Sequence, residues 1–215
     1  MVSITLVKNM IKVIIFDLGG IIIPGVAHPI SVLLSKKHKI ASKKIEKVIR
    51  LYWGNFAFKR ITEKSYWKKV INVLKLNETP ENIERLARII MNKTNENVIK
   101  TILLLKRNYR IVLLTDVPKE WFIYLNNRLD LKKVFSDIFV SYKIKLGKPH
   151  LVGTISKNVQ IYHYVLQKLN VSSNECLLID DHVENLVYPK KLGMKTILFK
   201  SSKQLTKDLK KLGVL

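Results

Sequence analysis

The stretch KVIIFDLGGIIIP, residues 12–24, decides the fold that the sequence predicts. Residues 13–16 form a continuous apolar run, which is typical of a buried strand in a parallel sheet and is too short to span a membrane. The run ends at one carboxylate, Asp17, and the glycines Gly19 and Gly20 follow. Open α/β sheets place their ligand sites at this end of a strand, and glycines let the backbone approach a ligand.

Three later stretches also place polar side chains directly after an apolar run or in a loop. Residues 113–116, LLTD, end an apolar run with Thr115 and Asp116. Residues 147–149, GKP, place a lysine before a turn, and residues 176–181, CLLIDD, end in two adjacent carboxylates. Adjacent carboxylates after so apolar a strand repel each other unless a cation or hydrogen bonds compensate. This pair therefore favours a metal site.

The four stretches, in this order, resemble the motifs of the haloacid dehalogenase superfamily, and the resemblance covers essentially the whole chain. It implies a doubly wound parallel α/β sheet with Asp17 as a nucleophile that forms an aspartyl-phosphate. Lys148 would bridge the nucleophile and the phosphate as a fixed positive charge. The hydroxyl of Thr115, the amide of Asp116 and the backbone at Gly20 would bind the phosphate.

The same resemblance implies a magnesium ion, because two carboxylates cannot crowd an anionic phosphate without a cation. Its protein ligands would be an oxygen of Asp17, the backbone carbonyl of Gly19 and the carboxylate of Asp181. Asp180 and Asn185 would orient the water molecules on the metal.

Residues 23–92 interrupt the alternation of strands and helices directly after the first strand. Apolar residues at three- and four-residue spacing predict helices near residues 29–38, 42–55, 62–76 and 80–91. Ser42 and Thr62 are expected to be N-caps. By resemblance this block is a helical cap domain, inserted into a core formed by residues 1–22 and 93–215. Its aromatic residues, one or two of which are expected to line the pocket, are Trp53, Phe56, Phe58, Tyr66 and Trp67.

The rest of the chain predicts alternating helices and strands, as a parallel sheet covered on both faces requires. The expected strands are residues 109–115, 137–141, 175–180 and 195–199. The expected helices are residues 94–108, 118–128, 159–169, 183–192 and 202–212. Residues 150–158 are interpreted as a local insertion, and residues 1–11 as a short lead-in strand or an extension.

The composition, with 47% apolar residues in a chain of 215, predicts a real hydrophobic core. The single cysteine, Cys176, and the lack of a secretory signal pattern favour the cytoplasm, and no apolar run is long enough for a membrane helix. The net charge of +23 favours anionic ligands. Lysines are nevertheless spread along the chain without any nucleic-acid-binding motif, so a small phosphorylated substrate is expected rather than nucleic acid.

Three positions depart from the family pattern. Family phosphatases usually carry a second Asp, which protonates the leaving group, where this chain has Gly19. Asp116 would place a carboxylate beside the phosphate unless its side chain turns away. Lys143 and Lys145 lie close enough in sequence to compete for the role of the motif lysine. The five histidines show no metal-ligand spacing, and His182 is interpreted as a loop residue.

The leading prediction is therefore a Mg²⁺-dependent phosphatase. A 2-haloacid dehalogenase is an alternative, in which Asp17 attacks carbon and no metal is needed. The acidic pair argues against it, because that pair makes sense mainly with a cation. A third alternative is a catalytically degenerate fold that binds a protein or nucleic acid, suggested by Gly19, Asp116 and the positive charge.

Overall fold

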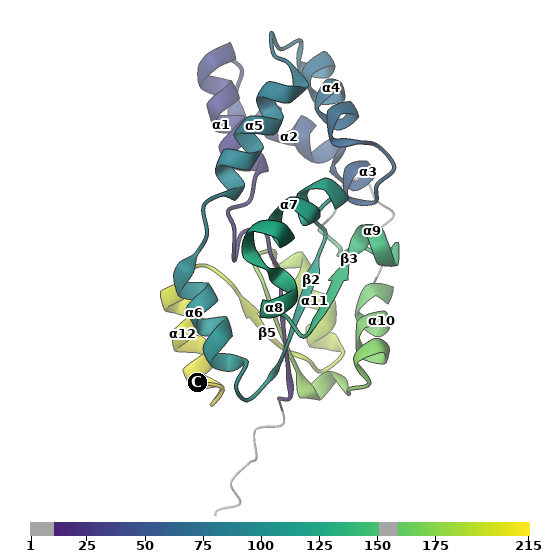
Figure 1. Ribbon diagram of the computed structural model, residues 1–215. Coiled ribbons are helices and arrows are strands. Elements are labelled where there is room, and N and C mark those ends of the chain that lie inside the picture. Colours follow the sequence, from purple (N-terminus) through teal and green to yellow (C-terminus); the bar gives the residue numbers. More distant parts are fainter. Residues whose placement is uncertain (1–10, 151–158) are drawn as a thin grey trace, which may run out of the picture.

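Figure 1 shows the computed structural model, which describes residues 11–150 and 159–215. The predictions for residues 1–10 and for residues 151–158 of the expected insertion lie outside the described residues. The described part has a five-stranded sheet flanked by helices. The strands are β1 (Val13–Phe16), β2 (Arg110–Thr115), β3 (Asp137–Val140), β4 (Cys176–Asp180) and β5 (Lys195–Leu198).

The sheet is parallel throughout, in the order β3-β2-β1-β4-β5, which confirms the predicted fold class. The central strand β1 pairs Phe16 with Leu113 of β2 and with Ile179 of β4. This register brings the carboxyl ends of three strands to the same edge of the sheet. The three polar motifs that follow these strands therefore meet at that edge.

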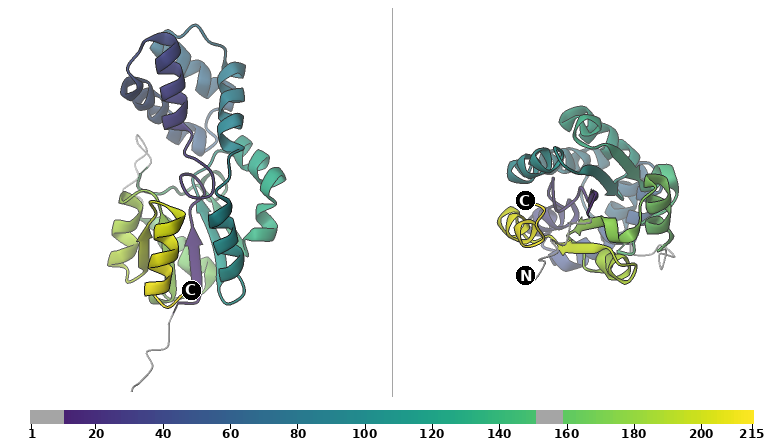
Figure 2. Two further views of the ribbon diagram at one scale, coloured as in Figure 1. Left: turned by 90° about the vertical axis from the view of Figure 1, so that its left-hand side faces the viewer. Right: turned by 90° about the horizontal axis from the view of Figure 1, so that it is seen from below.

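Alternate residues of the strands pack on opposite faces of the sheet, and the view from below in Figure 2 shows helices on both sides. Ile14 and Phe16 pack with helices α6 (Glu96–Leu105), α7 (Lys119–Leu129) and α12 (Ser202–Lys211). Val13 and Ile15 pack with α10 (Gln160–Leu169) and α11 (Glu184–Lys191). Three further short helices were not predicted: α8 (Leu131–Val134), α9 (Ser141–Ile144) and η1 (Ser173–Glu175).

Five helices between β1 and β2 lie together beyond the carboxyl end of the sheet (Figures 1 and 2), and we call them the helical insertion. They are α1 (Ala27–His38), α2 (Ser42–Leu51), α3 (Trp53–Ala57), α4 (Glu63–Leu74) and α5 (Pro80–Met91). Thr62 caps α4 as predicted, because its side chain accepts a hydrogen bond from the backbone of Ser65. The prediction for Ser42 is wrong: Ala41 is the N-cap, and Ser42 already lies inside the helix, one residue too late to cap it.

Polar contacts join the helical insertion to the rest of the chain. The backbone N–H of Asn95 donates to the carbonyl of Ile22 (2.8 Å), so the two connecting segments lie side by side. Glu63 of α4 accepts a hydrogen bond from the indole of Trp121 in α7. In the described part of the chain, no helix is long and apolar enough to cross a membrane.

Candidate active site

Asp17 and Lys148 form the centre of the site. The N–H of Asp17 donates to the carbonyl of Ile179 (3.0 Å), so strand pairing fixes its backbone. The Nζ of Lys148 lies 2.9 Å from Oδ1 of Asp17 and 2.7 Å from Oδ2 of Asp180. The lysine is fully buried, whereas Lys143 and Lys145 are exposed. The structure therefore brings Lys148, and neither of its two competitors, into contact with Asp17.

The carboxylates of Asp17, Asp180 and Asp116 all interact electrostatically with this one ammonium group, so negative charge is in excess. Burial raises the pKa of Asp17 to about 8, although Lys148 opposes the shift. Burial also disfavours the charged form of Asp180, but Lys148 and the donors His182 and Asn185 outweigh it and hold the pKa below its ordinary value. Burial would likewise lower the pKa of Lys148, yet the surrounding carboxylates raise it well above its usual range. Lys148 thus stays positively charged.

A further carboxylate, Asp181, fits a metal site. Oxygens of Asp17, Asp180 and Asp181 lie within 4.8 Å of one another. One oxygen of Asp181, Oδ1, is buried and has no hydrogen-bond partner among the residues that the structure describes. Burial raises the pKa of Asp181, with a further contribution from Asp180. A divalent cation with oxygen ligands would supply the partner and the charge that this cluster lacks.

Gly20 lets the backbone pass close to Asp181. Its φ is +74°, and a Cβ built on it would lie 2.0 Å from Oδ2 of Asp181. At the neighbouring Gly19, a Cβ would meet no atom of the described residues within 4 Å. The two glycines therefore serve different purposes: Gly20 makes room for the carboxylate, and Gly19 lies beside open space in the cavity.

Gly20→Ala is expected to lower the free energy of unfolding by at least about 2 kcal/mol, because it adds a clash to an unfavourable positive φ. Gly19→Ala is the matched control and should change it by about 0.5 kcal/mol or less. Urea unfolding of both variants measures the difference. Equal losses in the two variants would show that the approach of Asp181 to the backbone does not constrain position 20.

Thr115 is the last residue of β2 and Asp116 follows it, and both are buried residues that line the cavity. The carboxylate of Asp116 faces the loop that carries Lys148. There it accepts a hydrogen bond from the backbone N–H of Lys148, which lies 3.2 and 3.4 Å from its two oxygens. Burial raises the pKa of Asp116 to about 7. This carboxylate is thus bound within the protein and is not a fully charged group beside a bound anion.

The predicted residue Asn185 and two histidines that sequence reasoning left out of the site, His150 and His182, form a network around the acidic pair. Asn185 donates to Oδ1 of Asp180 (2.9 Å), and the backbone N–H of His150 donates to Oδ1 of Asn185 (3.1 Å). The rings of His150 and His182 stack, with centroids 4.5 Å apart. His182 lies 3.8 Å from the carboxylate of Asp181. The signal for the two histidines was their position in the sequence: His150 follows Lys148 by two places, and His182 directly follows Asp181.

The buried environment of His150 predicts that the protein loses stability in acid. Burial, with the charge of Lys148, lowers the pKa of its imidazole from 6.5 to about 3. Between these values the unfolded chain binds a proton that the folded chain does not, so the free energy of unfolding falls as the pH falls. His150→Gln is expected to remove up to about 1.4 kcal/mol of this loss per pH unit. Urea unfolding of both proteins from pH 7 to pH 4 tests this, and parallel curves would contradict it.

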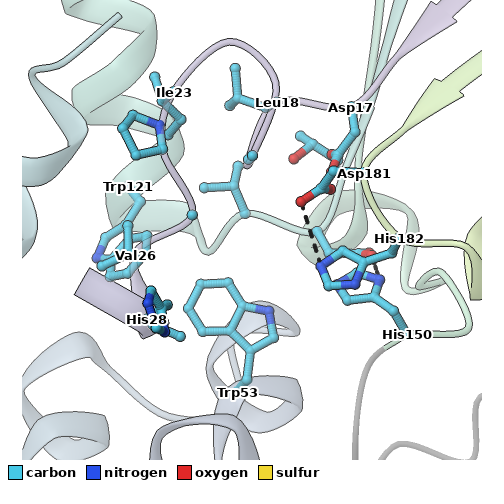
Figure 3. Close-up of a pocket in the computed structure, with 18 of the residues that line it drawn as sticks. Asp17, Leu18, Ile23, Val26, His28, Trp53, Trp121, His150, Asp181 and His182 are labelled. Carbon is cyan, nitrogen blue, oxygen red and sulfur yellow. Dashed lines mark ion pairs between the residues drawn. The ribbon is translucent and has the colours of Figure 1, made fainter. Parts of the chain in front are cut away.

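The site opens into a cavity of about 430 Å³ between the carboxyl end of the sheet and the helical insertion. Figure 3 shows Asp17, Asp181 and the two stacked histidines on one side of this cavity. Trp53 of the insertion lines it, as expected for one or two of the aromatic residues. Trp121 and Arg50 also line it, and no sequence signal singled them out.

Comparison with known proteins identifies the family. Residues 11–193 match the haloacid dehalogenase-like hydrolase family, so the chain belongs to that family of enzymes. A curated relative, drimenol cyclase from Aspergillus calidoustus, is 23% identical over 208 residues, 93% of this chain. The chain spans only 36% of that relative's length.

Solved structures share the fold. A family enzyme from Bacteroides thetaiotaomicron, in complex with magnesium and inorganic phosphate, has a TM-score of 0.69 at 18% identity, over 88% of this chain and 94% of the other. L-2-haloacid dehalogenase from Xanthobacter autotrophicus, with chloropropionic acid covalently bound, has a TM-score of 0.60 at 14% identity, over 95% and 84%.

Proposed function

We propose that this hydrolase is a Mg²⁺-dependent phosphatase that acts on a small phosphorylated metabolite through an aspartyl-phosphate at Asp17. One observation carries the proposal: carboxylate oxygens of Asp17 and Asp181 lie within 4.8 Å of each other, beside the buried ammonium of Lys148, and Oδ1 of Asp181 has no hydrogen-bond partner among the described residues. A dehalogenase that attacks carbon needs no such cluster. The similar Bacteroides protein, solved with magnesium and phosphate, supports the same chemistry.

In this mechanism Lys148 holds Oδ1 of Asp17, which leaves Oδ2 to attack phosphorus. The bond from phosphorus to the substrate oxygen breaks, and the departing alkoxide takes a proton from water. The hydroxyl of Thr115 and the amide of Asp116 bind phosphate oxygens, and Lys148 balances their charge. Water then attacks phosphorus, and the bond between phosphorus and Oδ2 of Asp17 breaks, which releases phosphate and restores the carboxylate; the proton that this water loses neutralises the hydroxide formed in the first step. A Mg²⁺ ion held by Asp17, the carbonyl of Gly19 and Asp181, with Asp180 and Asn185 orienting its waters, would supply further charge stabilisation.

The predicted division of the chain remains part of this proposal. Residues 23–92 act as a cap domain that covers the substrate, and residues 1–22 and 93–215 carry the chemistry. The polar contacts at Ile22 and Asn95 support a boundary at these connecting segments.

The proposal is tested by turnover of 4-nitrophenyl phosphate with Mg²⁺ or with EDTA, beside halide release from 2-chloropropionate. Phosphate release that requires Mg²⁺ supports the phosphatase. Halide release without metal would instead favour the dehalogenase. If neither reaction occurs, the degenerate binding fold gains support.

The leaving group should decide the rate, because Gly19 offers no side chain to protonate it. Phenyl phosphate and benzyl phosphate are similar in shape, but only benzyl phosphate releases a strongly basic alkoxide. We expect kcat/KM for phenyl phosphate to be higher by about 10²-fold or more, the usual contribution of a general acid. Gly19→Asp, for which the cavity has room, should raise the rate for benzyl phosphate selectively. Equal native rates for both esters would show that another group supplies the proton.

A further inference from the structure

The cavity has one polar side and one apolar side. Figure 3 shows Asp17, Asp181, His150 and His182 together on one side. The other described lining residues are mostly apolar, and they come from the loop between β1 and α1, from the helical insertion and from the segment around α7. They include Ile23, Val26, Ile49, Trp53, Val117 and Trp121. The side facing the carboxylates thus resembles a hydrophobic core more than a polar binding surface.

Three polar side chains on the apolar side are already bound within the protein. His28 and Arg50 both line the cavity, and both bind Glu46, at 3.1 Å and 2.7 Å. The indole N–H of Trp121 donates to Glu63. Trp121 and Trp53 stand with ring centroids 5.2 Å apart. The hydroxyls of a sugar would lose their water here and gain few partners, which disfavours a polyol.

We infer that the substrate is a phosphate monoester of an apolar alcohol, with an alkyl or aryl body that packs against Trp53 and Trp121. This inference rests on the proposed function, since it places the phosphate at Asp17. The amphipathic cavity orients such a molecule by itself: the phosphate lies at the polar side, and the body replaces water on the apolar side.

Binding of non-hydrolysable alkylphosphonates, measured by calorimetry on the native protein with Mg²⁺, separates recognition from turnover. Each buried methylene should tighten binding about 3-fold or more, so hexylphosphonate should bind at least about 30-fold tighter than propylphosphonate. 2,3-Dihydroxypropylphosphonate should bind no tighter than propylphosphonate. Trp53→Ala should weaken hexylphosphonate binding about 10-fold or more, with much less effect on methylphosphonate. Leu51→Ala, an exposed leucine two residues away, is the matched control.

Val26→Thr keeps the shape of the side chain and adds a hydroxyl to the apolar side, so it should weaken hexylphosphonate binding several-fold even if Trp53→Ala fails to fold. Affinity that does not depend on chain length, or that favours the dihydroxypropyl compound, overturns the inference.

Acetyl phosphate, which has no long apolar body, tests the proposed function separately. If the protein hydrolyses acetyl phosphate but its affinity for alkylphosphonates does not rise with the length of the alkyl chain, only the proposed substrate class is refuted. A chain-length effect without hydrolysis refutes only the phosphatase and leaves an apolar-anion binding site. Failure of both refutes both.

Discussion

Asp17→Asn is expected to lower the turnover of any substrate by about 10⁴-fold or more, because an amide cannot act as the nucleophile. The variant should stay folded, since the side chain keeps its size and Lys148 keeps its contact with Asp180. Steady-state rates with an aryl phosphate measure the loss. Residual activity within about tenfold of the native protein would remove Asp17 from the mechanism.

The same substitution has a second, opposite effect on stability. Burial raises the pKa of Asp17 from 3.8 to about 8. Its contribution to stability is thus fully present below pH 3.8 and is lost as the pH rises through 8. Without metal, Asp17→Asn should therefore become progressively more stable than the native protein as the pH rises across this window.

Urea unfolding at pH 5 and pH 8 in EDTA measures the difference in the free energy of unfolding between Asp17→Asn and the native protein. Millimolar Mg²⁺ should raise the melting temperature of the native protein more than that of the variant, which lacks one proposed ligand. If this difference does not change with pH, then burial does not raise the pKa of Asp17.

Lys148→Met should have the largest effect on stability. It removes the one ammonium that, among the described residues, contacts both Asp17 and Asp180, and it leaves these buried carboxylates without its compensating charge. Breaking a buried ion pair in this way costs about 3–5 kcal/mol. Turnover should fall by about 10²–10³-fold or more, because the charge beside the phosphate is lost. Urea unfolding and steady-state kinetics measure the two effects.

Lys145→Met is the matched control, since Lys145 is exposed on the same loop. It should leave stability and turnover nearly unchanged. The double variant Lys148→Met/Asp180→Asn also removes the negative charge of Asp180, one of the two carboxylates that lose their contact with Lys148. It should therefore be more stable than Lys148→Met alone. If Lys148→Met and Lys145→Met have the same free energy of unfolding, the buried ion pairs do not stabilise the fold.

Much of the fold could be predicted because its signals are local. Continuous apolar runs identified β1, β2 and β4, since strands buried on both faces need apolar side chains at every position. Three- and four-residue spacing identified the helices of the insertion, although the predicted helix over residues 42–55 is divided into α2 and α3. The N-cap at Thr62 was correct and that at Ser42 was not, because capping depends on where the backbone enters the helix.

The sequence by itself determined which residues meet at the carboxyl edge of the sheet. Asp17, Thr115 and Asp180 each end or follow a buried strand, and parallel pairing aligns those ends. The order of the motifs then pointed to the haloacid dehalogenase family, to which the chain belongs.

Only the tertiary structure decided which lysine contacts Asp17, where the carboxylate of Asp116 turns, and that His150 stacks on His182. It also placed Trp53 and Trp121, which are far apart in sequence, side by side in the cavity. The physical reason is that periodicity records which side chains are buried, whereas contacts between distant segments depend on how whole helices and loops pack against one another.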